Sequence, residues 1–151
     1  MHYLADTNVL LRSTHQNHPM HLIALTALTT LLGSGDRVCI TPQNIMEFWN
    51  ACTRPIERNG LGLTTNEADR EATRLEGLLI LLPEVPAIYP EWRRLVIAHS
   101  VSGVRVHDAH IVAAMNVYKI GNLLTFNVPD FTRYGGIEVV HPSDIVKKTS
   151  P

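Results

Sequence analysis

Four carboxylates are spaced widely along the chain, but each comes near a place where a predicted strand ends or a predicted helix begins. They are Asp6, Glu47, Asp108 and Asp130. In open α/β sheets, ligands bind at the edge where the carboxyl ends of the strands meet. Carboxylates gathered at one edge repel one another, and a divalent cation relieves that repulsion. Oxygen ligands of this kind suit Mg²⁺ or Mn²⁺, and one or two such ions can promote in-line attack on a phosphodiester.

Each acid taken alone also has a simpler structural interpretation. Thr7 or Asn8 can cap a helix that begins near Val9, or Asp6 can itself be a simple helix cap, and Asp108 can cap its own helix. Glu47 suits a solvated helix face, and Asp130 suits a loop residue that initiates a turn. The chemical interpretation therefore depends on whether the fold brings these four side chains together.

The elements that position the acids follow from the periodicity of apolar residues. Short apolar runs bounded by turn residues predict strands, and spacings of three and four residues predict helices. The expected strands are at residues 3–5, 37–40, 80–82, 122–125 and 137–140. The expected helices cover residues 9–13, 20–32, 42–52, 65–79, 88–100 and 107–120. Strands that alternate with helices indicate an α/β fold with a mainly parallel central sheet covered on both faces.

Local sequence signals mark several helix ends. Thr41 followed by proline predicts a cap with proline at the first helical position. The segment from Thr64 to Glu67 matches a capping box. Gly33 and Gly121 are expected to end the helices that precede them.

Composition places limits on the class of protein. The chain has 151 residues, of which 45% are hydrophobic and 18% charged, as in a folded globular domain. A net charge of −1 gives no general attraction to nucleic acid, so binding would need a local basic patch. Cys39 and Cys52 lie in apolar surroundings and form no metal or disulfide motif. They predict reduced core thiols in a cytoplasmic protein, and no apolar run is long enough to span a membrane.

Four segments of the sequence resemble PIN-domain nucleases, and more narrowly the VapC-type toxins of toxin–antitoxin pairs. They are LADTNVLL at residues 4–11, MEF at 46–48, VHDAHIVAA at 106–114 and LTFNVPDF at 124–131. The segments occur in the family's order and extend over most of the chain. The resemblance implies a single PIN-like domain over residues 1–151, folded as a three-layer α/β/α sandwich.

The resemblance also implies the chemistry of the site. It implies a ribonuclease that depends on Mg²⁺ or Mn²⁺, with Asp6, Glu47 and Asp108 as its acidic core. Many members carry an aspartate two residues after the threonine that ends the strand, where this chain has Asn127. The acid comes three residues later, so either Asp130 or Asn127 completes the site. The supporting polar residues at the same edge are expected to be Thr7, Asn8, Thr125 and Asn127.

Partners follow from the same resemblance. It implies an RNA substrate, a homodimer, and a small cognate antitoxin that inserts a basic side chain among the acids. Arg12 and Arg54 are predicted to contact phosphate because they follow Asp6 and Glu47 on the same segments, and His107 is a further predicted substrate contact.

A second group of histidines, near the first helix, invites a zinc interpretation. His15, His18 and His21 are three residues apart, but Pro19 interrupts them and no cysteine or acid completes a ligand set. We interpret them as a chance surface cluster.

Other functions of α/β domains with acidic edges fit the sequence less well. A phosphatase of the haloacid-dehalogenase type needs a second aspartate where this chain has Asn8, and a response-regulator receiver needs paired acids and a late lysine. A non-catalytic PIN-like module that binds RNA or protein, or a housekeeping PIN nuclease, remains as the alternative.

Overall fold

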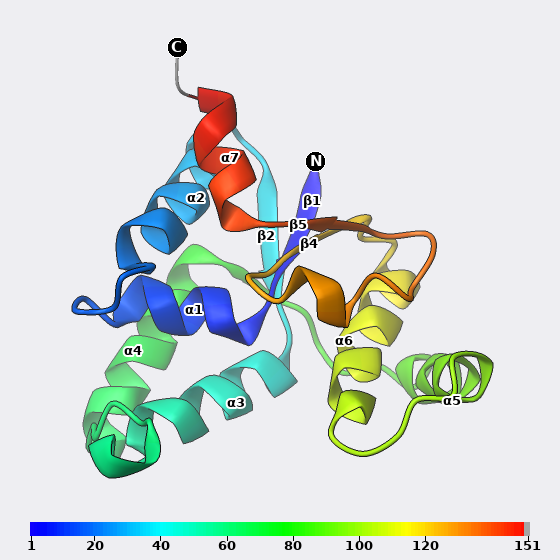
Figure 1. Cartoon of the computed structure of the whole chain (residues 1–151), viewed down its shortest axis with the longest axis horizontal. Coiled ribbons are helices and arrows are strands. Elements are labelled where there is room, and N and C mark those ends of the chain that lie inside the picture. The colour runs from blue at the N-terminus through cyan, green and yellow to red at the C-terminus, as the bar shows by residue number, and fades with distance from the viewer. Residues whose placement is uncertain (150–151) are drawn as a thin grey trace.

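A parallel sheet of five strands lies at the centre of the molecule, with the strand order β3-β2-β1-β4-β5 (Figure 1). The structure is a computed structural model and describes residues 1–149. Its strands are β1 (His2–Ala5), β2 (Arg37–Ile40), β3 (Ile80–Leu81), β4 (Asn122–Leu124) and β5 (Glu138–Val140). Leu4 of β1 pairs with Cys39 of β2 on one side and with Leu123 of β4 on the other. The strands are short, and the three central ones, β1, β2 and β4, are largely buried, as expected for a parallel sheet covered on both faces, whereas the edge strand β3 is exposed.

Helices cover both faces of the sheet, which confirms the three-layer α/β/α arrangement. Figure 1 shows α5 and α6 together on one side and the remaining helices on the other. Two separate hydrophobic clusters fill the two spaces between helices and sheet. The helices are α1 (Thr7–Thr14), α2 (His21–Gly33), α3 (Pro42–Thr53), α4 (Thr65–Leu78), α5 (Ile88–Ala98), α6 (Arg105–Tyr118) and α7 (Pro142–Thr149). Among the described residues, no helix combines the length and apolar character needed to cross a membrane.

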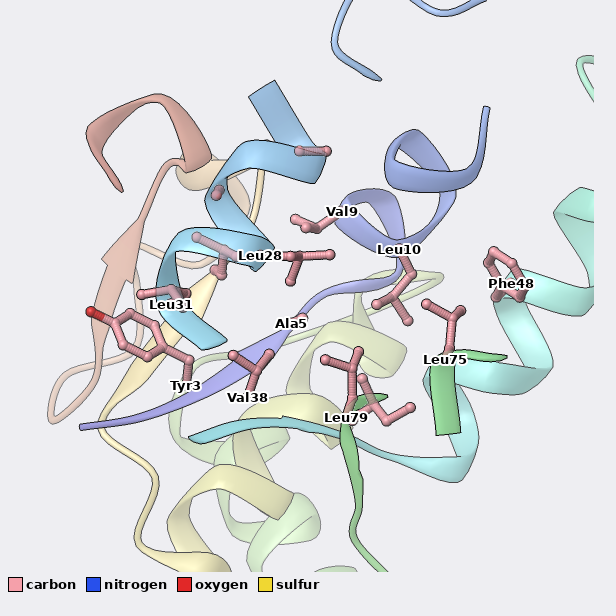
Figure 2. Close-up of a cluster of buried hydrophobic side chains, with 14 of the residues drawn as sticks. Tyr3, Ala5, Val9, Leu10, Leu28, Leu31, Val38, Phe48, Leu75 and Leu79 are labelled. Atoms are coloured by element: carbon pink, nitrogen blue, oxygen red, sulfur yellow. The ribbon is translucent and has the colours of Figure 1, made fainter. Parts of the chain in front are cut away.

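The larger hydrophobic cluster fixes the junction between β1 and α1. Ala5 of β1 and Val9 and Leu10 of α1 are fully buried, and they pack with side chains of α2, α3 and α4 (Figure 2). Asp6 lies between these apolar residues, so its backbone is held on both sides by burial. The site begins from a rigid position rather than from a mobile loop.

Two predicted helix starts are confirmed. Thr41 caps α3 and forms a reciprocal capping box with Asn44, and Thr64 forms one with Glu67 at the start of α4. Each box satisfies two backbone N–H groups that a helix otherwise leaves without a partner.

Other boundaries differ from the prediction. The first helix begins at Thr7 rather than near Val9, and its cap is Asp6 rather than Thr7 or Asn8. The helix α6 begins at Arg105 rather than at residue 107. Its first turn starts at Gly103, which has a φ of 63° and whose carbonyl accepts the Val106 N–H at 3.2 Å.

The end of α6 and the presence of α7 also depend on long-range packing. The helix α6 ends at Tyr118, not at Gly121, since Lys119 takes a left-handed φ of 58° and the next residue, Ile120, is buried. The helix α7 was not predicted from the sequence; it packs on α2, and its Ile145 joins the larger hydrophobic cluster. Cys39 and Cys52 are buried and free, as expected.

Candidate active site

The candidate site lies where the carboxyl ends of β1 and β4 meet. The chain passes outward from β1 to β2 and β3, and then returns to the other side of β1 to form β4 and β5. The edge at such a reversal is open and is the usual position of a ligand site in an α/β sheet. Asp6 follows β1 and Thr125 follows β4, and the Asp6 N–H donates to the Leu124 carbonyl at 2.9 Å.

Asp6 is held by a closed set of hydrogen bonds. One carboxylate oxygen accepts the Thr7 N–H at 2.8 Å, which caps α1. The other accepts the Thr125 hydroxyl at 2.8 Å and the Asn8 amide at 3.2 Å. Asn8 also donates to the Thr125 hydroxyl at 3.1 Å and accepts the Phe126 N–H at 3.1 Å. The predicted supporting residues Thr7, Asn8 and Thr125 therefore contact Asp6 or one another directly.

Burial dominates the electrostatics of Asp6, whose side chain is 9% exposed. Loss of solvent raises its pKa to about 6, against the lowering effect of the hydrogen bonds from Thr125 and Thr7. The charges of Asp108 and Glu47 make smaller contributions to the same rise in pKa. Three carboxylates from three separate segments thus act on one another through space.

Glu47 lies on α3 and is positioned by Gln43, one turn earlier. The Gln43 amide donates to Glu47 at 2.9 Å and to the backbone carbonyl of His107 at 3.0 Å. The side-chain amide oxygen of Gln43, Oε1, also contacts the ring of His110. Gln43 therefore connects α3 to the first turn of α6 across the site. The face of α3 that carries Glu47 is exposed, as its solvated interpretation requires, but Glu47 has a defined hydrogen-bond partner there.

Asp108 and Asp130 meet on either side of one arginine. The Nη1 atom of Arg105 lies 2.6 Å from Oδ2 of Asp130 and 3.3 Å from Oδ2 of Asp108. Partial burial raises the pKa of Asp108, and Arg105 acts in the opposite direction. Asp108 lies in the first turn of α6 but does not cap it, so the capping interpretation of Asp108 is wrong.

The structure adds residues that the sequence prediction did not assign to the site. Asn44 is fully buried, and its amide donates to the Thr7 hydroxyl at 3.2 Å, which joins the start of α3 to the start of α1. The sequence signal for Asn44 was its position three residues after the Thr41 cap, which suits a capping-box partner. Gln43 and Arg105 are two further such residues, and only the fold gives them their partners.

The predicted substrate contacts lie at different distances from the acids. Arg12 is at the far end of α1 from Asp6, and Arg54 caps the far end of α3. His107 is exposed in the first turn of α6, beside Asp108. Asn127 is exposed, and its backbone N–H donates to the Thr125 hydroxyl at 3.0 Å, so it supports the site through its backbone.

The chemistry of these side chains fits a hard divalent cation. Four carboxylates face one edge, and burial and mutual repulsion raise the pKa of two of them. Within residues 1–149, however, no three acidic, histidine or cysteine side chains are already close enough together to hold a metal ion. Arg105 has the position between Asp108 and Asp130, so its guanidinium supplies the positive charge there.

Comparison with known proteins agrees with this fold. The family model of the PIN domain matches residues 3–137. The chain therefore belongs to the PIN domain family. No curated protein sequence matches it.

Several solved structures share the fold at low sequence identity. The chain is similar to VapBC-1 from nontypeable Haemophilus influenzae, with a TM-score of 0.70 and 16% identity over 95% of this chain and 99% of that one. It is similar to VapC20 from Mycobacterium tuberculosis, described as a sarcin–ricin loop cleaving toxin, with a TM-score of 0.67 and 19% identity over 91% and 98% of the chains. It is also similar to FitAcB from Neisseria gonorrhoeae, with a TM-score of 0.64 and 20% identity over 93% and 98%.

The burial of Asp6 predicts a pH-dependent stability in the absence of metal. Because the folded pKa is about 6 and the ordinary value is 3.8, the folded state holds the proton more tightly than the unfolded state. Above pH 6 the ionised carboxylate therefore lowers the free energy of unfolding by up to about 3 kcal/mol. Below pH 3.8 this penalty is absent, because the carboxyl group is protonated in both states. In EDTA at about pH 8, we expect Asp6→Asn to raise the free energy of unfolding, and the gain to shrink toward about pH 4.

Denaturant unfolding at several pH values measures this effect. Asp69→Asn, at an exposed position on α4, is the matched control and should change the free energy of unfolding little. If Asp6→Asn is less stable than the wild type at about pH 8, its capping and hydrogen bonds outweigh the cost of its charge.

The position of Arg105 predicts competition with a divalent cation. A cation bound by Asp108 and Asp130 has to displace the guanidinium that lies between them. We expect Arg105→Gln to bind Mn²⁺ several-fold more tightly than the wild type in a calorimetric titration. Arg94→Gln removes an exposed arginine paired with Glu91 and should leave the affinity unchanged. Weaker Mn²⁺ binding by Arg105→Gln would instead show that Arg105 orders the acids for the metal.

Proposed function

We propose that this protein is a ribonuclease that depends on Mg²⁺ or Mn²⁺, and that it is the toxin of a type II toxin–antitoxin pair. The observation that carries the proposal is the convergence of Asp6, Glu47, Asp108 and Asp130 at one sheet edge. Membership of the PIN domain family and the likeness to VapC-type structures support it.

The four acids would hold the cation, which when bound would activate water and offset the charge that develops during phosphodiester cleavage. Asp6 is the most firmly placed of them, because three donors fix both of its oxygens. Gln43 orients Glu47 and keeps α6 in register with α3. Of the two candidates for the fourth ligand, Asp130 is favoured over Asn127 because it brings a charge and already faces Asp108.

A partner surface adjoins the acids. A hollow of about 740 Å³ lies between α3, α5 and α6, and Met46, Trp92 and Val106 line it together with Glu47. Met46 is 68% exposed although it is apolar. This hollow would accept an apolar segment of an antitoxin, with a basic side chain of the same segment reaching the acids.

We further propose that the chain forms one domain, assembles as a homodimer and acts in the cytoplasm. Large apolar side chains remain exposed on and beside α5, including Tyr89, Ile97 and Val104, and such groups favour association. The two free, buried cysteines agree with a reducing compartment.

Cleavage assays test the catalytic proposal. We expect the purified protein to cut RNA with Mg²⁺ or Mn²⁺, and EDTA to stop the reaction. Asp6→Asn and Asp108→Asn should each lower the cleavage rate by at least a hundredfold while the fold is kept, since each removes a charge that the cation needs. Circular dichroism and thermal unfolding check the fold.

The same assay separates the alternatives. Asp69→Asn serves as the control for loss of one exposed acid and should cleave at the wild-type rate. Activity that persists in EDTA would exclude the metal mechanism. A wild-type protein that binds RNA without cutting it under any metal condition would favour a non-catalytic PIN module.

Growth experiments test the toxin proposal. We expect expression of the wild-type chain alone to arrest growth, because an unrestrained ribonuclease degrades the cell's RNA, and expression together with its cognate antitoxin to restore growth. The Asp6→Asn chain should be harmless and should still bind the antitoxin through the apolar hollow. Normal growth with active wild-type protein and no partner would favour a housekeeping nuclease.

A further inference from the structure

A second hollow lies at the other end of α1 from the acids. It measures about 890 Å³ and lies between the end of α1, the segment that follows it, the turn at Ile56–Arg58 and α4. Figure 1 shows α1 running from the end of β1, at the centre of the molecule, outward to its edge beside α4. A hollow of this size is within the range of small-molecule sites, roughly 300–1,000 Å³.

Positive charge in this hollow is not neutralised. Arg12 lines it, and in the described part of the chain no acid pairs with its guanidinium and no hydrogen bond from its side chain is made. Partial burial lowers the pKa of Arg12, which indicates that its charge is only partly solvated. Glu71 is the one acid in the lining, and Arg74 already pairs with it at 3.0 Å.

Two histidines line the same hollow. The rings of His15 and His18 lie 5.4 Å apart, and the buried Nδ1 of His15 has no hydrogen-bond partner. Burial lowers the pKa of His18, and the neighbouring Arg12 and His15 lower it further. The hollow thus contains an unpaired guanidinium, an imidazole nitrogen without a partner and a second imidazole that is repelled by its neighbours. This combination is what an anion-binding site presents when no anion is bound.

The rest of the lining suits a nucleotide. Amide side chains of Asn17 and Asn59 offer further donors, and Leu61 and the exposed Ile56 offer apolar surface for a base. The position also agrees with the proposed cleavage site. The eight residues of α1 extend roughly 12 Å, which is the length of about three or four nucleotides of a stacked strand.

We propose that this hollow is a phosphate subsite in which Arg12 and His15 bind a phosphodiester of the RNA strand, a few nucleotides from the bond that is cut. The inference rests on the proposed ribonuclease function for the identity of the strand. It also changes the interpretation of the three histidines, which the sequence analysis took as a chance cluster. His21 belongs to a different contact, since its ring bonds to the backbone carbonyl of Arg12 at 2.9 Å.

Binding measured against salt tests the subsite. Fluorescence anisotropy in EDTA, where RNA is not cut, gives the affinity for a labelled twelve-nucleotide RNA. We expect Arg12→Gln to weaken binding about tenfold, and to reduce the slope of log affinity against log salt by about 0.7, the value for one lost contact to a single strand.

A matched charge control isolates the site from net charge. Arg93→Gln removes an exposed arginine from α5, on the other side of the sheet, and should leave the salt slope unchanged. An equal change in slope for Arg93→Gln and Arg12→Gln would overturn the proposal, because the effect would then belong to net charge.

A second measurement needs no variant. In ¹H–¹⁵N spectra of the histidine rings, we expect inorganic phosphate, but not chloride at equal ionic strength, to shift the signals of His15 and His18 in the wild type. No shift together with an unchanged slope would overturn the site. A shift with an unchanged slope for Arg12→Gln would assign the hollow to free anions and overturn the RNA contact.

The outcome is separable from that of the proposed function. If the protein cuts no RNA but shows the Arg12-dependent slope, the nuclease proposal fails and the phosphate subsite stands. If it cuts RNA and the slope is unchanged, only the subsite fails.

Discussion

The hydrogen bond from Thr125 to Asp6 is the interaction on which the site depends. It joins the ends of two neighbouring strands that are 119 residues apart in sequence, at a point closed to solvent. A buried carboxylate is unfavourable unless it is hydrogen-bonded. Asn8 and the Thr7 N–H provide the remaining bonds. The same residue therefore caps a helix and faces the other acids, and its structural and chemical roles are parts of one arrangement.

The other acids are placed by contacts between helices rather than between strands. Gln43 connects α3 to α6, and Asn44 connects α3 to α1, so the distance between Asp6, Glu47 and Asp108 is set by how α3 packs. Phe48 of the same helix is fully buried in the core below. Apolar burial on one face of α3 thus fixes polar geometry on the other.

Charge is separated along α1. Its first turn adjoins a group of carboxylates, where the guanidinium of Arg105 supplies the opposite charge. Its last turn carries Arg12, which has no such partner among the described residues. A polyanion that is to be cut by acids needs a cation at the point of cleavage and basic side chains elsewhere along its path. In the proposed ribonuclease, the two ends of α1 would meet these two needs.

Some helix boundaries could not be predicted, for a physical reason. The start of α6 is set by the turn at Gly103 and by a bond from the Trp92 indole to the Val106 carbonyl at 2.8 Å. Its end is set by burial of Ile120. Such contacts come from residues distant in sequence or from the depth of the core, and periodicity within one segment does not contain them.

The sequence by itself determined the α/β class, the positions of the five strands, one capping box and one further helix cap, and it singled out the four acids as candidates. These depend on local patterns, namely apolar runs, caps and the residues that follow strands. Only the tertiary structure decided which polar groups serve the acids. It brought Thr125 to Asp6, set Arg105 between Asp108 and Asp130, and gave Arg12 no acidic partner within residues 1–149. Those outcomes depend on the order of the strands and on helix packing, which join residues from opposite ends of the chain.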